Sequence, residues 1–238
     1  ARKLATLNTF FGYFHKKEMI QKNAPSVVDV PRVKEKNIIR LDANEVAQLI
    51  DNIESGEKLT KQQKVWHERN KARDLAIVVT LLGTGVRVTE LVGLDLSDLD
   101  FDNGAMRVIR KGGNEDIVYF GEETEEMLRN YLDERMQMTP APGHENALFI
   151  SQNNTRITVR SVERLVKKYA STATVKKITP HKLRSTYGTA LYQETGDIYL
   201  VADVLGHKNV NTTRKHYAAM KEENKRKAAN IVQLREKE

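Results

Sequence analysis

The sequence contains no cysteine, and it has only five prolines and 6% aromatic residues among its 238 residues. The absence of cysteine excludes disulfide bridges and zinc sites built on thiolates, although it does not identify a cellular compartment. No apolar run approaches the roughly 18 residues that a transmembrane helix needs, and the N-terminus lacks the apolar core of a signal peptide. We therefore expect a cytoplasmic protein with no membrane segment and no metal site.

The charge of the sequence is positive and unevenly distributed. The formal net charge is +7 and the isoelectric point is near 9.4. Residues 156–217 hold twelve lysines and arginines against four acidic residues, so most of the positive excess lies in this quarter of the chain. Such clustering is typical of a surface that faces phosphates, as in nucleic-acid binding. On charge alone, a solvated basic surface is equally consistent.

The N-terminal region shows an amphipathic pattern followed by an irregular stretch. Within residues 1–24 the apolar side chains recur at helical spacing, at Leu4, Leu7, Phe10, Phe11 and Phe14. A single helix cannot bury such a face by itself, so we expect residues 1–24 to belong to a domain that is largely missing upstream. Residues 25–40 contain two prolines and no steady period, which indicates a linker.

The remaining chain reads as helices around one β-hairpin. Asp42 and Gly56 are the expected start and end signals of one helix, whereas the polar segment 57–70 gives no clear assignment. The runs Met106–Ile109 and Ile117–Phe120 flank a glycine-containing turn and predict two antiparallel strands, with a third short strand near 99–101. We predict a mostly helical α+β fold with a small three-stranded antiparallel sheet.

The stretch ITPHKLRSTYGTALYQETG has the signals of a helix start and end. Thr179 is placed as the N-cap, Pro180 is at the first helical position and Gly196 follows the end. His181 and Arg184 then lie in the first turns, on one face of the helix. Because the first turn has unpaired N–H groups and the positive end of the helix dipole, this is a candidate anion site.

The stretch LGHKNVNTTRKHY, residues 205–217, places a tyrosine among cations. The preceding helix is capped by Asp197 and ends at Gly206, which is followed by His207. Ten positions later Tyr217 follows Arg214, Lys215 and His216. A tyrosine usually lies where its ring can be buried, so this is either a solvated helix or a phenol with a chemical role.

Two further cations stand at backbone turns. Arg87 follows Gly85 at the start of a predicted helix, and its ordinary interpretation is an ion pair with Glu90 one turn later. Lys111 lies in the predicted hairpin turn, where a lysine ordinarily serves only solubility. Each residue alone has an ordinary structural explanation. Only their order along the chain and their local contexts, taken together, indicate a shared function.

Taken together, these residues resemble the catalytic set of the tyrosine recombinases, the phage integrase and Xer family. The segments GTGVRVTELVGL, HKLRSTYGTAL and LGHKNVNTTRKHY are similar to the family's first-arginine, H-x-x-R and histidine-to-tyrosine motifs. The resemblance covers residues 41–220, which we expect to form the catalytic domain, with residues 221–238 as a C-terminal tail helix. Residues 1–24 look like the last helix of the family's N-terminal core-binding domain, which would be truncated. Segment 57–70 is longer than the family's loop at this place.

The resemblance implies a role for each matched residue. Arg87, His181, Arg184 and His207 would hold the scissile phosphate, Lys111 would be the hairpin lysine, and Tyr217 would be the nucleophile. Further DNA contacts are expected at Arg156, Arg160, Lys182, Lys208 and Arg214.

The implied chemistry is consistent with elementary electrostatics. Negative charge grows on the phosphate oxygens during in-line attack, so guanidinium groups and imidazoles aimed at them stabilise the transition state. A free phenol has a pKa of about 10 and is a poor nucleophile at neutral pH, and nearby cations favour its ionised form. A 3'-phosphotyrosyl link keeps the bond energy, so no metal, nucleotide or other cofactor is expected.

The implied partner is double-stranded DNA, held by a homo-tetramer on paired sites. The tail 221–238 has apolar residues along one side and is expected either to dock on a neighbouring subunit or to pack within its own chain. Two alternatives stay open. A type IB topoisomerase shares the chemistry but relaxes supercoils as a monomer, and a DNA-binding module would have lost a catalytic residue.

Overall fold

The computed structural model describes residues 2–29, 39–207, 210 and 213, and the chain divides into two compact units, Ala1–Asn37 and Ile38–Glu238. The first unit contains helix α1 (Arg2–Lys16) and the short 3-10 helix η1 (Ala24–Val27). Along α1 the side chains of Leu7, Phe10 and Tyr13 are exposed. The predicted helix in this region is therefore present, and part of its apolar face is open within this unit.

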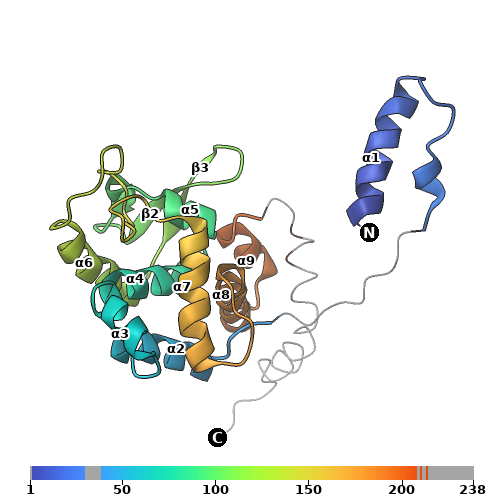
Figure 1. Cartoon of the computed structure of the whole chain (residues 1–238). Helices are drawn as coiled ribbons and strands as arrows, with labels where there is room; N and C mark the ends of the chain where they lie inside the picture. The colour runs from blue at the N-terminus through green and yellow to red at the C-terminus, as the bar shows by residue number, and fades with distance from the viewer. Residues whose placement is uncertain (1, 30–38, 208–209, 211–212, 214–238) are drawn as a thin grey trace, which may run out of the picture. The chain divides into compact units, whose positions relative to one another are not determined.

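The second unit consists of packed helices with a small sheet at one edge (Figure 1). Its helices are α2 (Ala43–Ser55), α3 (Lys61–Glu68), α4 (Lys71–Thr84), α5 (Val88–Gly93), α6 (Glu122–Arg135), α7 (Val159–Ala173), α8 (Pro180–Thr195) and α9 (Ile198–Val204), with the 3-10 helix η2 (Leu96–Asp98). Its strands are β1 (Leu99–Asp100), β2 (Ala105–Ile109) and β3 (Glu115–Tyr119). The predicted mostly helical α+β fold is confirmed. No helix in the described part of the chain is long and apolar enough to cross a membrane.

Capping interactions explain where the first helices of this unit begin. The Asp42 side chain accepts a hydrogen bond from the backbone N–H of Glu45, and the Glu45 carboxylate accepts one from the backbone N–H of Asp42. Thr60 and Gln63 form the same reciprocal pair at the start of α3. The predicted cap at Asp42 is confirmed, whereas α3 falls within segment 57–70, which the hydrophobic pattern left unassigned.

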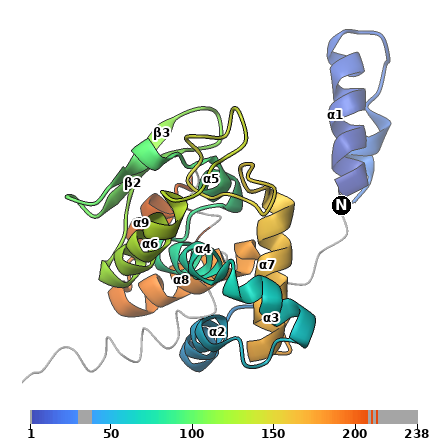
Figure 2. The ribbon, with the colours of Figure 1, turned by 60° about the vertical axis from the view of Figure 1, so that its left-hand side comes forward.

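The sheet has the strand order β1-β2-β3 and is antiparallel throughout. Ile109 pairs with Glu115 across the hairpin, so residues 110–114 form the connecting turn. The backbone N–H of Arg110 donates to the Asn114 carbonyl oxygen at 2.7 Å and closes this turn. Figure 2 shows the hairpin extending along one edge of the unit, as the alternation of apolar residues predicted.

Helix α4 lies at the centre of the second unit and packs against α2, α6 and α8 (Figures 1 and 2). Most of its side chains are buried, including Ile77 and Leu81. Gly85 ends this helix in the left-handed conformation, with φ of 64°. The C-terminal end of the most buried helix therefore leads directly into the turn that carries Arg87.

Candidate active site

The turn between α4 and α5 positions Arg87. Gly85 is required here for two reasons, because its φ is positive and because a Cβ atom would lie 2.4 Å from the Tyr187 ring and 2.9 Å from Leu205. The close approach brings α8 and the end of α9 against this turn. Arg87 follows as the N-cap of α5, where it leaves the left-handed turn in an extended conformation.

Arg184 joins this turn to the end of α9. The side chain extends from the second turn of α8, and the residue is only 4% exposed. Its Nη1 donates to the carbonyl oxygen of Gly85 at 2.5 Å, and its Nη2 donates to the carbonyl oxygen of Leu205. One buried guanidinium therefore connects segments that are 99 and 21 positions away along the chain.

Arg87 reaches the same pair of segments from the other direction. Its Nη1 lies 2.6 Å from Oε1 of Glu90, and its Nη2 donates to the carbonyl oxygen of Gly206 at 3.1 Å. The Arg87 side chain remains 33% exposed, so part of the guanidinium faces solvent. The expected ion pair with Glu90 is present, and it holds Arg87 beside the turn that precedes His207.

His207 follows a second left-handed glycine. Gly206 has φ of 58°, and the backbone N–H of His207 donates to the Ala202 carbonyl oxygen at 2.8 Å, which closes α9. The Nδ1 atom of His207 lies 2.7 Å from the hydroxyl oxygen of Thr213, which is fully buried. The imidazole is half-buried, and its hydrogen bond with Thr213, six residues later, fixes its orientation.

His181 lies on the first turn of α8, three residues before Arg184, and it is exposed. Thr179 occupies the predicted N-cap position, but its side chain makes no capping hydrogen bond. Pro180 stands at the first helical position, as predicted. The helical spacing places His181 and Arg184 on the same side of α8.

Lys111 is exposed in the hairpin turn. The two glycines after it have φ values of 101° and 83°, and a Cβ at either position would meet no neighbouring atom. Backbone conformation alone therefore explains these glycines. The turn places Lys111 next to Arg110, whose side chain reaches Glu90 at 3.0 Å and the carbonyl oxygen of Val204 at 3.3 Å.

Sequence reasoning did not select Glu90 or Arg110 as site residues. Glu90 is almost completely buried and its carboxylate lies between the guanidinium groups of Arg87 and Arg110. Its position three residues after Arg87, at the start of a helix, is a local signal that could have identified it. Arg110 had no such signal, because its partners lie on three separate elements.

The predicted DNA contacts differ in their surroundings. Arg156 donates to the carbonyl oxygens of Val92 and Leu94 at 3.2 and 2.7 Å, and it pairs with Asp95. These contacts fasten the segment before α7 to the end of α5, so most donors of this guanidinium are used within the chain. Arg160 is exposed on α7 and Lys182 is half-buried on α8. Lys208, Arg214, the nucleophile candidate Tyr217 and the tail 221–238 lie outside the described residues.

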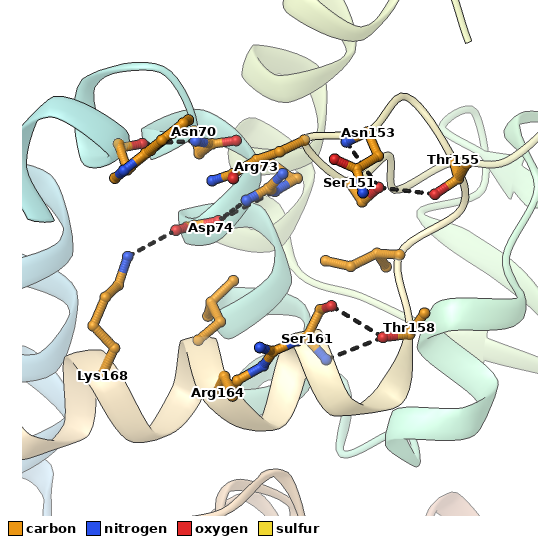
Figure 3. Close-up of a pocket in the computed structure, with 14 residues that line it drawn as sticks. Asn70, Arg73, Asp74, Ser151, Asn153, Thr155, Thr158, Ser161, Arg164 and Lys168 are labelled. Atoms are coloured by element: carbon orange, nitrogen blue, oxygen red, sulfur yellow. Dashed lines mark hydrogen bonds and ion pairs between the residues drawn. The ribbon is translucent and has the colours of Figure 1, made fainter. Parts of the chain in front are cut away.

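A separate pocket of about 510 Å³ lies between α7, the start of α4 and the loop 151–155 (Figure 3). Its wall contains Asp74, which is bound by Arg73 at 2.7 Å and by Lys168 at 3.3 Å. The Tyr169 hydroxyl donates to the same carboxylate at 3.0 Å. Burial, followed by the neighbouring Asp74 charge, raises the pKa of Tyr169, which keeps this phenol protonated. None of the predicted catalytic residues lines this pocket.

Among the described residues, no group of histidine and carboxylate side chains has the arrangement of a metal site. The charged side chains at these turns are instead three arginines, Arg87, Arg110 and Arg184, together with Glu90, and the imidazole of His207 lies beside them. Guanidinium groups bind phosphate oxygens through paired N–H donors, so an oxyanion is the ligand that this arrangement accommodates best.

Known proteins resemble this chain over most of its length. The model of the phage integrase family matches residues 39–224. The tyrosine recombinase XerC of Thermodesulfovibrio yellowstonii is 35% identical over 218 residues, which are 90% of this chain and 69% of the relative. The XerC of Corynebacterium glutamicum is 42% identical over 148 residues, which are 62% of this chain and 47% of the relative. The chain thus spans about half to two thirds of the length of these curated relatives.

A solved structure, that of the Tn1549 transposon integrase in complex with circular intermediate DNA, superposes on this chain with a TM-score of 0.68. The two are 25% identical, and the match covers 91% of this chain and 73% of the integrase. The similarity of fold therefore extends over most of the chain.

Proposed function

Because the chain belongs to the phage integrase family, we propose that it is a site-specific recombinase that cleaves and rejoins DNA through a 3'-phosphotyrosyl intermediate. The observation that carries the proposal is the convergence of Arg87, Arg184 and His207 on two adjoining glycine turns. Arg87 and Arg184 come from distant parts of the chain. Arg87 donates to the carbonyl oxygen of Gly206, which precedes His207, and Arg184 donates to that of Gly85, which lies in the turn before Arg87.

The two arginines supply the charge that cleavage of a phosphodiester needs. Carbonyl oxygens carry only a partial charge, so they orient Arg184 without cancelling its charge. Arg87 is paired with Glu90, and its side chain remains 33% exposed. Such fixed donors stabilise an anionic transition state because they need no reorganisation when the charge develops. His181 and His207 complete the set of donors around the phosphate.

In the proposed reaction the Tyr217 oxygen attacks the phosphorus and the bond to the 5'-oxygen breaks. The phenol releases its proton to solvent, which neighbouring cations favour, and the 5'-oxygen takes a proton from Lys111. The products are a 3'-phosphotyrosyl link and a free 5'-hydroxyl. Attack by the 5'-hydroxyl of a partner strand reverses these steps, restores the phenol and joins the new strand.

The proposed partner is double-stranded DNA. The solved Tn1549 integrase structure is a complex with DNA, and the excess of basic residues in 156–217 is consistent with a phosphate-binding surface. Exchange between two duplexes needs four cleavages, so we propose a homo-tetramer on paired sites. The tail 221–238 is the segment that we propose to dock on a neighbouring subunit.

The variant Tyr217→Phe tests this function. It should form no covalent protein–DNA adduct while binding duplex DNA within a few fold of the wild type, because only the attacking oxygen is removed. Adducts are scored on denaturing gels with nicked duplexes, whose sequence is first obtained by capturing wild-type adducts from a randomised library. Adducts at the wild-type level in Tyr217→Phe would contradict the assignment, and relaxation of supercoils without strand exchange would indicate a topoisomerase.

A further inference from the structure

Arg110 makes contacts to three different elements from the base of the hairpin turn. Its Nε donates to Asp116 on β3 at 2.9 Å, its Nη1 to Glu90 on α5 at 3.0 Å, and its Nη2 to the carbonyl oxygen of Val204 on α9 at 3.3 Å. The side chain is only 10% exposed. Every nitrogen of this guanidinium therefore points to a different segment of the fold.

The Arg110 guanidinium also packs against the turn that precedes His207. A Cβ atom at Gly206 would lie 2.9 Å from both Cζ and Nε of Arg110. The guanidinium thus fills the space that any side chain at Gly206 would need. The carbonyl oxygen of this same glycine accepts the hydrogen bond from Arg87, so Arg110 and Arg87 hold Gly206 from two sides.

We infer that Arg110 is a positioning residue for the proposed reaction: it sets the hairpin that carries Lys111 against the turn that carries His207 and, through Glu90, against Arg87. The inference rests on the proposed function of these three groups. Residues 87, 110 and 207 are far apart in sequence, and the shared contacts of Arg110 are what hold their segments in one arrangement.

A guanidinium suits this role better than an ammonium group. Its donors lie in one plane and point in fixed directions, so three acceptors on three segments can be held at once. A lysine at the same position supplies charge but cannot reach Asp116, Glu90 and the Val204 carbonyl together. The low exposure and the two carboxylate partners of Arg110 also distinguish it from a residue that binds a DNA phosphate directly.

The first test needs no DNA and uses the absence of cysteine in this chain. Asn114→Cys, in the exposed turn, carries a nitroxide label whose mobility is measured by electron paramagnetic resonance. Arg110→Lys should increase the mobility of the label in the folded protein. Arg107→Lys is the matched control, because Arg107 lies on the same hairpin and is 45% exposed. Among the described residues it pairs only with Asp98 and Glu115, and a lysine can replace it in these ion pairs.

The second test measures the rate at which the covalent adduct forms on the nicked duplex described above. Arg110→Lys should lower this rate by about 10- to 100-fold, with DNA affinity changed less than about threefold, because misplaced catalytic groups cost rate rather than binding. Arg107→Lys should cleave at the wild-type rate. Sulfur at the bridging 5' position should restore only part of the Arg110→Lys loss, since it replaces only the contribution of Lys111.

Three outcomes decide the inference. Unchanged label mobility in Arg110→Lys would overturn it, and so would increased mobility with a normal cleavage rate. Wild-type protein that forms no adduct with any duplex would overturn the proposed function instead, and the label would still report whether Arg110 holds the hairpin.

Discussion

Two buried carboxylates in this fold each hold two cations, yet they lie in different surroundings. Glu90 lies between Arg87 and Arg110, with a side chain that is 1% exposed. Asp74 lies between Arg73 and Lys168, with a side chain that is 3% exposed. Burial and pairing are nearly the same, so neither property explains why one cluster is assigned to catalysis and the other is not.

The difference is in what the neighbouring groups contribute. The Asp74 carboxylate also accepts a hydrogen bond from Tyr169, and Tyr169 accepts one from His67, so this cluster fastens α4 to α3 and α7. Around Glu90 the neighbouring segments add Arg184, which donates to backbone carbonyls. Carbonyl contacts orient a cation and leave its charge in place. Arg73 in the Asp74 cluster also donates to a carbonyl oxygen, that of Ile150 at 3.0 Å, so carbonyl contacts occur in both clusters. We expect the Glu90 cluster to differ through the additional arginine, Arg184, and through the exposed part of the Arg87 side chain.

The largest effect is expected at Arg184. Arg184→Lys should lower the rate of adduct formation by about 10²- to 10³-fold, because the donors of an ammonium group lie on one nitrogen and cannot replace the planar, spaced donors of the guanidinium. Arg135→Lys is the matched control, since Arg135 is also buried and also donates to backbone carbonyls, those of Glu145 and Ala147. Single-turnover cleavage on denaturing gels measures both. Equal losses in the two variants would contradict a role for Arg184 in the chemistry.

The two carboxylates themselves provide the next comparison. Asp74→Asn should lower the free energy of unfolding by about 3 kcal/mol, because it leaves buried cations without their counter-charge. Its cleavage rate per folded molecule should stay within about threefold of the wild type. Glu90→Gln should lower both stability and cleavage rate, since it loosens Arg87 and Arg110. Urea unfolding and single-turnover cleavage separate the two variants, and equal cleavage rates would remove the distinction between the clusters.

At the hairpin a smaller and more specific effect is expected. Lys111→Ala should lower the rate of adduct formation by about 10²-fold if Lys111 protonates the leaving oxygen. Sulfur at the bridging 5' position should restore most of this rate, because a thiolate leaves without a proton. Arg87→Ala is the control and should gain little from sulfur. Equal rescue of both variants would assign the proton donor to another residue.

A third carboxylate, Glu45 near the surface, extends the comparison to pH. Burial alone would raise the pKa of Glu45, but hydrogen bonds from Lys176, Thr174 and the Asp42 backbone outweigh it and lower the pKa from 4.5 to about 2. The group therefore stabilises the fold above pH 4.5, and this contribution is lost as the pH falls towards 2.

The expected size of the Glu45 contribution is about 2 kcal/mol after allowance for solvent screening. Urea unfolding at pH 7 and pH 3 should show a smaller difference in Glu45→Gln than in the wild type. Lys176→Met removes one partner and should have part of the same effect. An unchanged pH dependence in Glu45→Gln would show that other carboxylates control acid stability.

Local signals in the sequence predicted much of the fold and of the candidate site. Asp42, Asp197 and Pro180 mark helix starts because caps act within a few residues of themselves. The alternation of apolar residues predicted the hairpin, because this pattern also acts over a few neighbouring positions. The segment 57–70 was missed because α3 shows its capping pair but has a weak apolar pattern.

Groups whose partners lie far away in the chain could not be assigned in this way. For Arg156 the DNA contact stays a prediction, and the structure adds hydrogen bonds to two carbonyls and to Asp95 that no local pattern indicated. Arg110 looked like an ordinary residue next to a turn. Its contact with the Val204 carbonyl spans 94 positions, which no local pattern can indicate.

The sequence by itself determined which residue types stand at which helix ends and turns, because caps, glycines and apolar periods act over a few neighbouring positions. The resemblance of its motifs to those of the tyrosine recombinases grouped Arg87, His181, Arg184 and His207 as a set in chain order. Only the tertiary structure decided that Arg184 donates to the carbonyl oxygens of Gly85 and Leu205, that Arg87 donates to that of Gly206, and that Glu90 pairs with two cations. These contacts form when α4, α8 and α9 pack, since a guanidinium can bridge only segments that burial of the core has already brought together.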